Sequence, residues 1–229
     1  MENSLRGLFI PLITPFTADG ELAADALERL AHAVLDAGAA GLVALGTTGE
    51  PATLSTVERD AVLDICAGVC RDRGAILIAG AGSNDTASTV RALRDLAAWP
   101  EVSAALTVVP YYTRPTEDGV IAHFTRLAAD SPVPVLVYNI PYRTGMYLSG
   151  QALRELVRIP GIAGIKHAVG GIDQDTLTLT VKWKLNSPKP GSFVTQAFTH
   201  PGEAVLVEKV EAKVVFDPLA PKTEEKDKR

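Results

Sequence analysis

Cysteine, histidine and long apolar runs are scarce in this sequence, and each shortage excludes a class of protein. Among 229 residues there are two Cys and four His. No apolar stretch approaches the roughly 20 residues that a membrane-spanning helix needs, so no membrane segment is expected. The opening letters MENSLRG lack the basic region and apolar stretch of a secretory signal. We therefore expect a cytoplasmic protein.

Positive charge is too sparse for a nucleic-acid-binding protein. The formal net charge is −5, and no stripe of Lys and Arg stands out, so nucleic acid is not an expected partner. Cys66 and Cys70 lie four residues apart on an expected helix, a spacing that could suit a metal ion. No further Cys or His lies nearby to complete such a site. We interpret both as core thiols in a reducing compartment and expect neither a metal nor another cofactor.

Lysine is almost absent from the first 181 residues. Residues 1–181 contain twelve Arg and one Lys, Lys166, whereas residues 182–229 contain eight Lys and one Arg. We interpret this switch as a junction between two stretches of different origin, near residues 173–181. The alternative is a basic surface in the C-terminal part of the chain.

A repeating unit occupies most of the chain. Short runs rich in Val, Ile and Leu begin near Leu8, Gly41, Ala75, Ser103, Val133 and Gly161. Because these runs are apolar on both faces, they predict buried parallel strands. The segments between them have helical periodicity. Their expected N-terminal caps are Ser55 (with Glu58 in a capping box), Asp85, Thr116 and Ser149.

A βα unit of about 30 residues, repeated in this way, is typical of a (β/α)8 TIM-type barrel. A doubly wound open sheet uses the same units, so periodicity does not decide between them. The repeat stops after six units, at Lys166, and the following text alternates like antiparallel strands and turns. We expect an incomplete barrel over residues 1–175 and a divergent, β-rich tail over residues 176–229 that is disordered at its end.

Lys166 ends the run Gly161-Ile-Ala-Gly-Ile-Lys, at the point where a barrel strand delivers side chains to the active face. Apolar neighbours disfavour the ammonium form, lower the pKa of the amine and make it a nucleophile that can condense with a ketone. The resulting protonated imine can stabilise an enamine at the neighbouring carbon. The alternative is a strand-end lysine that simply reaches water.

Two loops at the same edge add polar groups. Gly46-Thr47-Thr48-Gly49-Glu50 follows the second strand, and its backbone N–H groups could hold a carboxylate, although an ordinary turn would look the same. Tyr138 closes the fifth strand and could exchange a proton with an imine, and Arg143 could clamp a second carboxylate. Tyr111 and Tyr112 follow the fourth strand. Each tyrosine could equally serve in packing.

The sequence contains six motifs in a fixed order: Thr14-Pro15-Phe16, GTTGE at 46–50, AGAGSN at 79–84, PYYTRPT at 110–116, YNIPYRTG at 138–145 and GIK at 164–166. Together they resemble the dihydrodipicolinate synthase / N-acetylneuraminate lyase family of class I, Schiff-base aldolases, over roughly residues 6–175. The resemblance implies that Lys166 forms the imine with pyruvate and that Tyr138 donates and accepts protons. It also implies that Thr48 and the backbone around Gly46 and Gly49 bind the pyruvate carboxylate.

The resemblance further implies a proton relay of Thr47, Tyr138 and Tyr112, with Tyr112 reaching across from a neighbouring subunit of a homo-oligomer, a tetramer in this family. Arg143 matches the residue that binds the carboxylate of the aldehyde substrate in the synthase branch, and the lyase branch usually lacks it. The expected activity is therefore condensation of pyruvate with aspartate semialdehyde, in lysine biosynthesis. The alternatives are another 2-oxo acid aldolase, such as a sugar-acid lyase, or an inactive fragment or fusion acting as a structural module.

Two features depart from the family pattern. His167 stands where the family commonly carries an acidic residue, and we interpret it as structural because it should point away from the substrate. Beyond about Asp175 the sequence no longer resembles the last two βα units, which help to close the barrel. We expect the resulting gap to admit water beside Lys166, to return its pKa toward the roughly 10.4 of a free lysine, and to leave little or no synthase activity.

Overall fold

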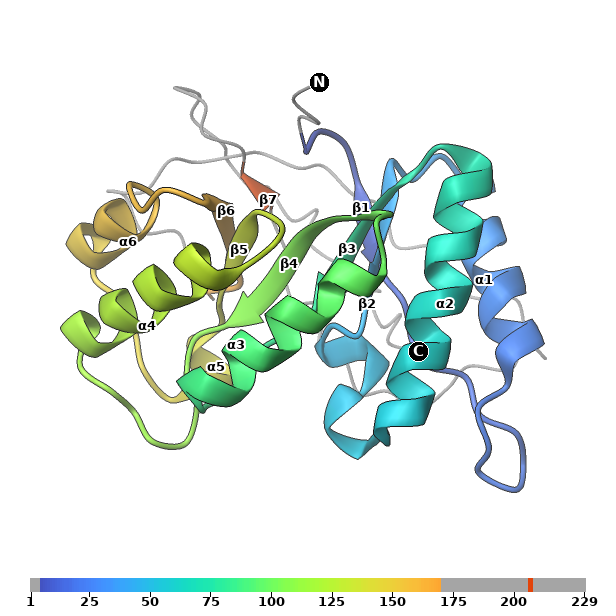
Figure 1. The fold of residues 1–229 in the computed structure, drawn as a ribbon, viewed down its shortest axis with the longest axis horizontal. Helices are drawn as coiled ribbons and strands as arrows, with labels where there is room; N and C mark the ends of the chain where they lie inside the picture. The colour runs from blue at the N-terminus through green and yellow to red at the C-terminus, as the bar shows by residue number, and fades with distance from the viewer. Residues whose placement is uncertain (1–4, 170–205, 208–229) are drawn as a thin grey trace, which may run out of the picture.

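The computed structural model describes residues 5–169 and 206–207 of the chain. Six strands alternate with helices along it (Figure 1). Each strand begins within two residues of an apolar run in the sequence, which confirms the predicted βα repeat. The strands are β1 (Phe9–Pro11), β2 (Gly41–Ala44), β3 (Ile76–Gly80), β4 (Val102–Val108), β5 (Val135–Asn139) and β6 (Ile162–His167).

The helices begin where the sequence places their caps. Ser55 and Glu58 form the expected capping box, and the side chains of Asp85, Thr116 and Ser149 each accept a hydrogen bond from a backbone N–H in the first turn. These bonds satisfy N–H groups that a helix start otherwise leaves unpaired. The helices are α1 (Ala24–Asp36), α2 (Thr56–Arg73), α3 (Thr86–Asp95), α4 (Glu117–Asp130), α5 (Pro141–Thr144) and α6 (Gly150–Leu156). Short 3-10 turns are η1 (Thr47–Gly49), η2 (Pro51–Thr53) and η3 (Leu96–Ala98).

Strand order decides between the two folds that the repeat allows. β1 to β6 are hydrogen-bonded in chain order, and every neighbouring pair among them is parallel. A doubly wound sheet instead reverses its order part-way and carries helices on both faces. Here α1, α2, α3, α4 and α6 all bury residues in one apolar cluster shared with a single face of the sheet. The six strands therefore form a half-barrel of the (β/α)8 type.

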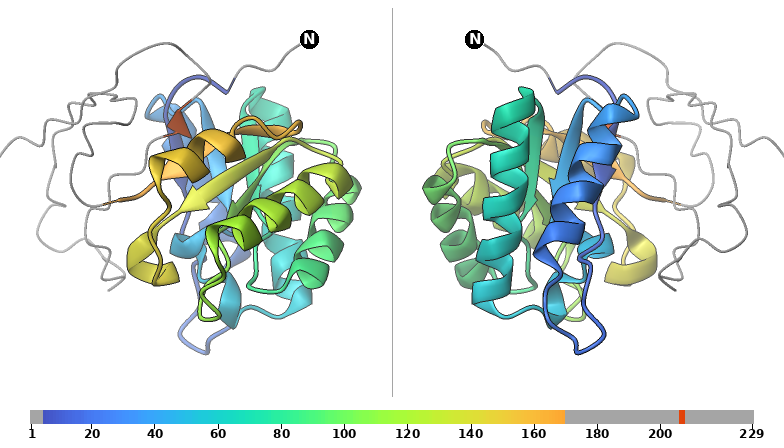
Figure 2. Two further views of the ribbon diagram at one scale, coloured as in Figure 1. Left: turned by 90° about the vertical axis from the view of Figure 1, so that its left-hand side faces the viewer. Right: turned by 90° about the vertical axis from the view of Figure 1, so that its right-hand side faces the viewer.

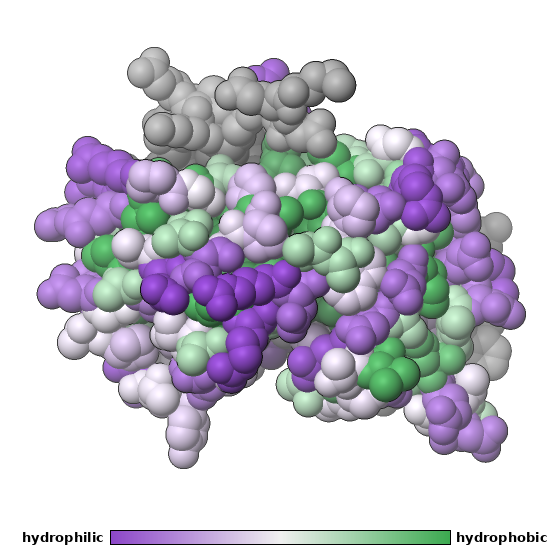
Figure 3. Space-filling view, viewed as in Figure 1, coloured by the Kyte–Doolittle hydropathy of each residue, from purple (hydrophilic) through white to green (hydrophobic). Residues whose placement is uncertain are grey.

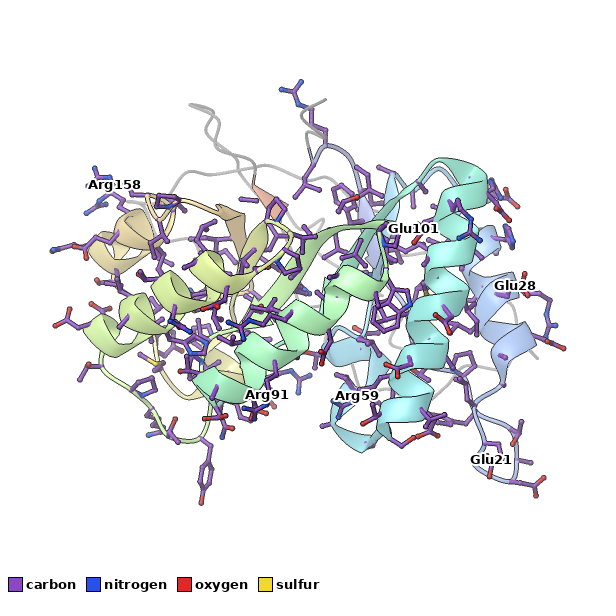
Figure 4. The ribbon with its side chains drawn as sticks, viewed as in Figure 1. Glu21, Glu28, Arg59, Arg91, Glu101 and Arg158 are labelled. Atoms are coloured by element: carbon purple, nitrogen blue, oxygen red, sulfur yellow. The ribbon has the colours of Figure 1, made fainter. Side chains whose placement is uncertain are left out.

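The sheet has an inner and an outer face with separate cores. Neighbouring helices α1 and α2 pack side by side on the outer face, as do α3 and α4 (Figures 1 and 2). Hydrophilic side chains are prominent on the exposed surface of the helical layer (Figure 3), where charged residues such as Glu28 and Arg158 lie (Figure 4). The inner face holds a smaller cluster of Val43, Ile78, Ala104, Leu106, Leu136 and Tyr138.

A short strand, β7 (Leu206–Val207), pairs antiparallel with the far side of β6. It falls within the alternating stretch after Lys166 that the sequence predicts to form antiparallel strands. The other predicted tail strands and the charged C-terminal end lie outside the described residues, so the proposed division near residue 175 stays a prediction. None of the described helices has the length and apolar character needed to cross a membrane.

Candidate active site

Lys166 and Tyr138 lie against each other at the C-terminal end of the parallel strands. They are direct partners in the register of β6 and β5. The Nζ atom of Lys166 lies 4.2 Å from the centroid of the Tyr138 ring. Tyr138 belongs to the inner apolar cluster, so the amine is held on the inner face of the half-barrel. Barrel enzymes place their active sites at this end of the strands.

Burial changes the acidity of the lysine. Lys166 is half-buried, and burial lowers its pKa to about 8 because an ammonium ion loses hydration in apolar surroundings. At neutral pH a sizeable fraction of the amine is therefore uncharged and able to attack a carbonyl carbon. We expected water beside β6 to return the pKa toward that of free lysine. Burial instead keeps the pKa low.

Tyr138 connects the lysine to two further predicted site residues. It is only 7% exposed, and burial raises its pKa. A hydrogen bond with the side chain of Thr47 and the positive charge of Arg143 oppose that rise, because both favour the phenolate. Thr47, Tyr138, Arg143 and Lys166 thus gather at one site, although they come from three different segments of the chain.

The loop after β2 is held by close contacts with the segment after β1. Gly46 and Gly49 are buried and Thr48 is half-buried, whereas Thr47 is exposed. The hydroxyl of Thr14 donates a hydrogen bond of 2.7 Å to the carbonyl oxygen of Gly49. A Cβ atom on Gly49 would lie 3.2 Å from the backbone oxygen of Leu12, so a larger residue would press on the segment after β1.

Backbone strain marks both ends of that loop. Leu45 and Glu50 have φ values of 54° and 51°, in the left-handed region that residues other than glycine rarely adopt. Gly80 on β3 makes room for this bend, because a Cβ atom there would lie 2.0 Å from the carbonyl oxygen of Leu45. Such strain persists where the surroundings impose it, often at functional sites.

Tyr112 does not join the group within the described chain. Its side chain is 87% exposed and its φ is 69°. Among the described residues no hydrogen bond connects it to Thr47 or Tyr138. Arg143, on α5, is exposed as well, at the rim of the site. A groove of about 320 Å³ between α1 and α2 lies on the outer helical layer, across the sheet from Lys166, and is not part of this site.

Comparison with known proteins identifies the family. Residues 4–184 match the family model described as the dihydrodipicolinate synthetase family. This chain belongs to that family. It is 41% identical over 168 residues to the 4-hydroxy-tetrahydrodipicolinate synthase of Moorella thermoacetica, covering 73% of this chain and 57% of that protein. It is 43% identical over 187 residues to the Stenotrophomonas maltophilia enzyme of the same name, covering 81% of this chain and 61% of that one.

Solved structures of the dihydrodipicolinate synthetase family share the half-barrel. The dihydrodipicolinate synthase of Acinetobacter baumannii, crystallised with pyruvate, is 36% identical and superposes with a TM-score of 0.69, covering 72% of this chain and 56% of that one. The chain thus spans less than two thirds of the length of each of these relatives.

Some residues of the site in this family member were not assigned a role from the sequence. Thr14 lies in the Thr14-Pro15-Phe16 motif, but only the structure reveals that it holds the loop through Gly49. The strain at Leu45 depends on Gly80, 35 positions along the chain, and had no local signal. Asn139, next to Tyr138, is buried and contacts His167.

Proposed function

We propose that this chain is a pyruvate-dependent class I aldolase, most like 4-hydroxy-tetrahydrodipicolinate synthase, which condenses pyruvate with aspartate semialdehyde. The observation that carries the proposal is the amine of Lys166, with its pKa lowered to about 8 and its Nζ atom 4.2 Å from the ring centroid of Tyr138, at the C-terminal end of the strands. The names of relatives at 41% and 43% identity support the same activity.

The reaction begins at the uncharged amine of Lys166. Its nitrogen attacks the carbonyl carbon of pyruvate, and loss of water leaves a protonated imine. That positive charge withdraws electrons, so a proton leaves the methyl carbon and an enamine forms. The enamine carbon attacks the aldehyde carbon of the second substrate, which forms the new carbon–carbon bond, and the aldehyde oxygen takes up a proton while the enamine becomes an imine again. Attack of water or of the second substrate's own amine on that imine then frees Lys166. Tyr138, with its hydrogen-bonded partner Thr47, would supply and remove the protons that these steps require.

Two carboxylates need separate binding groups. The N–H groups of the loop around Gly46, Thr48 and Gly49 would bind the carboxylate of pyruvate, because a tightly held backbone turn provides oriented donors. Arg143 would bind the carboxylate of the aldehyde at the rim. A sugar-acid lyase would not need that arginine, so its presence favours the synthase activity.

Tyr112 is assigned to a neighbouring copy of the chain. Its exposure is what a residue that completes the relay of another subunit requires, and it supports a homo-oligomer. The tetrameric state and the cytoplasmic location stay predictions, as does the assignment of residues 1–175 as the barrel portion.

Reductive trapping tests the proposed function. Incubation of the full chain with pyruvate and cyanoborohydride should add one reduced pyruvyl group, which peptide mapping should place on Lys166. Lys166→Arg should abolish the adduct, because a guanidinium stays protonated and forms no imine. Adducts confined to lysines of residues 182–228 would refute the proposal, and absence of any adduct would favour the structural-module alternative. If the imine forms, turnover of sugar acids in place of aspartate semialdehyde would identify a lyase.

A further inference from the structure

A second cross-strand pair follows Tyr138 and Lys166, one residue further along β5 and β6. Asn139 and His167 are the next partners in the register of β5 and β6. Because side chains alternate along a strand, this pair faces the helical layer while Lys166 and Tyr138 face the inner cluster. The Nδ2 atom of Asn139 lies 3.2 Å from the Nδ1 atom of His167.

The chemistry of this contact is directional. The amide nitrogen of Asn139 donates to Nδ1 of His167 when the ring carries its proton on Nε2. Asn139 is 1% exposed, and among the described residues its Oδ1 atom has no hydrogen-bond partner. Burying an amide costs free energy unless it is hydrogen-bonded, so the contact with His167 offsets part of the cost of burying Asn139.

The pairing of β6 with β5 is irregular, so a side-chain contact between the two strands can help to fix its register. The pairing of β5 with β6 shifts between Val135 and Leu136, because Val135 pairs with Ile162 but Leu136 pairs with Gly164. A slip of one residue would turn Lys166 to the helical face. Beyond the pair, the backbone N–H of Ala168 donates to the carbonyl oxygen of Asn139 at 2.8 Å and continues the ladder. On its other side, β6 meets only the two-residue β7 within the described chain.

We propose that the hydrogen bond between Asn139 and His167 is a positioning device that holds the Lys166 amine against the Tyr138 ring. Neither residue touches substrate; they act through the strand register. The effect on imine formation rests on the proposed function, whereas the effect on the geometry of Lys166 does not.

Two readouts separate those consequences. In NMR spectra of the full chain with labelled lysine, the ring current of Tyr138 should shift the Lys166 ε-methylene protons upfield, and Lys166→Arg assigns the signal. The rate of reductive trapping with pyruvate, measured over a range of pyruvate concentrations, reports the chemistry.

His167→Leu removes the acceptor at nearly constant size. It should move the Lys166 signal toward that of free lysine. It should also slow trapping at saturating pyruvate about 10- to 100-fold, as small misplacements of a reacting group do, with a smaller change in the half-saturating concentration. His167→Asn keeps an oxygen at the position of Nδ1 and should restore both readouts to within a few-fold. If His167→Leu does not fold, Asn139→Ser breaks the same contact from the other strand.

The matched control is Val137→Ala, which shortens a buried side chain on the same face of β5 without touching the pair. It should lower the melting temperature but leave the NMR signal and the trapping rate unchanged. An upfield signal that persists in His167→Leu, or that is lost equally in Val137→Ala, would overturn the inference. Failure of the wild-type chain to trap pyruvate would count against the proposed function alone, because the NMR signal still decides the inference.

Discussion

The Nζ atom of Lys166 and the ring of Tyr138 face each other at 4.2 Å, from directly paired positions on β6 and β5. A cation held against an aromatic ring is favoured by about 0.5–2 kcal/mol, which would raise the pKa of the lysine. Burial acts in the opposite direction, and the pKa falls to about 8. Desolvation is therefore the larger effect, and it makes the amine reactive.

The rate of imine formation should rise through a pKa near 8. Only the uncharged amine attacks pyruvate, so the initial trapping rate should increase with pH and level off above about pH 9. At pH 7.5 a lysine with this pKa has an uncharged fraction about 200-fold larger than one at the usual 10.4. Adducts on the other lysines of the chain provide an internal control. A midpoint close to 10 for Lys166 would contradict the burial argument.

Lys166→Met should stabilise the fold near neutral pH. The pKa of Lys166 is lower in the folded chain than in the unfolded chain, so the unfolded state binds more protons between about pH 8 and 10.5. The folded state of the wild type is therefore penalised below pH 8, by up to roughly 3 kcal/mol, and recovers as pH rises through that window. Urea unfolding should give a more stable Met variant at pH 7 and a smaller difference at pH 10. Arg158→Met, at an exposed position, should give no such pH dependence.

Local signals in the sequence predicted the elements of the fold. Caps such as Ser55 and Asp85 need only residues within one turn, and the buried strands are continuous apolar runs, so both could be identified without the structure. The ends of those strands then indicated Lys166 and Tyr138 as site residues.

Contacts between distant segments could not be predicted in the same way. The left-handed conformation of Leu45 depends on the absence of a Cβ atom at Gly80. The irregular pairing that brings Asn139 opposite His167 begins at Val135, at the other end of the strand. Neither has a local pattern, because each depends on which segments the half-barrel brings together.

Arg143→Ala should impair the reaction with aspartate semialdehyde but not the reaction with pyruvate. Pyruvate trapping on Lys166 should persist, whereas kcat/KM for aspartate semialdehyde should fall about 10- to 100-fold, as expected for a charged hydrogen bond of 1.5–3 kcal/mol. The pKa of Tyr138 should also rise further, because Arg143 opposes the effect of burial. Arg158→Ala is the matched control at an exposed arginine away from the site. Equal loss of trapping and turnover would mean that Arg143 has a structural role.

The wild-type chain should form the imine with pyruvate but turn over slowly. The groups needed for the imine, from Thr47 to Lys166, lie within the described half-barrel. We predict that the residues after about Asp175 do not supply the family's last two βα units, although the family model matches as far as residue 184. We therefore expect near-stoichiometric trapping of pyruvate but slow condensation. Replacing the residues after Asp173 with the C-terminal part of a relative should raise turnover without changing the trapped lysine. Rapid turnover by the 229-residue chain would contradict this expectation.

His123 should make the fold sensitive to acid. This residue of α4 is 5% exposed, its Nδ1 atom lies 2.8 Å from the hydroxyl oxygen of Thr86, and burial lowers its pKa to about 4, partly opposed by the charge of Asp85. Because that pKa lies below the roughly 6.5 of an unfolded histidine, the unfolded state binds more protons between pH 4 and 6.5. Stability should therefore fall as the pH drops through this window.

The loss attributable to His123 should reach about 2 kcal/mol between pH 7.5 and pH 5. His123→Phe keeps an aromatic ring beside Phe124, which now meets the histidine edge-on, and removes the titrating group. The difference in unfolding free energy between the two pH values should shrink by that amount in His123→Phe. Urea denaturation of the wild type and of His123→Phe at both pH values measures this directly. An unchanged pH dependence in His123→Phe would show that the acid sensitivity arises elsewhere.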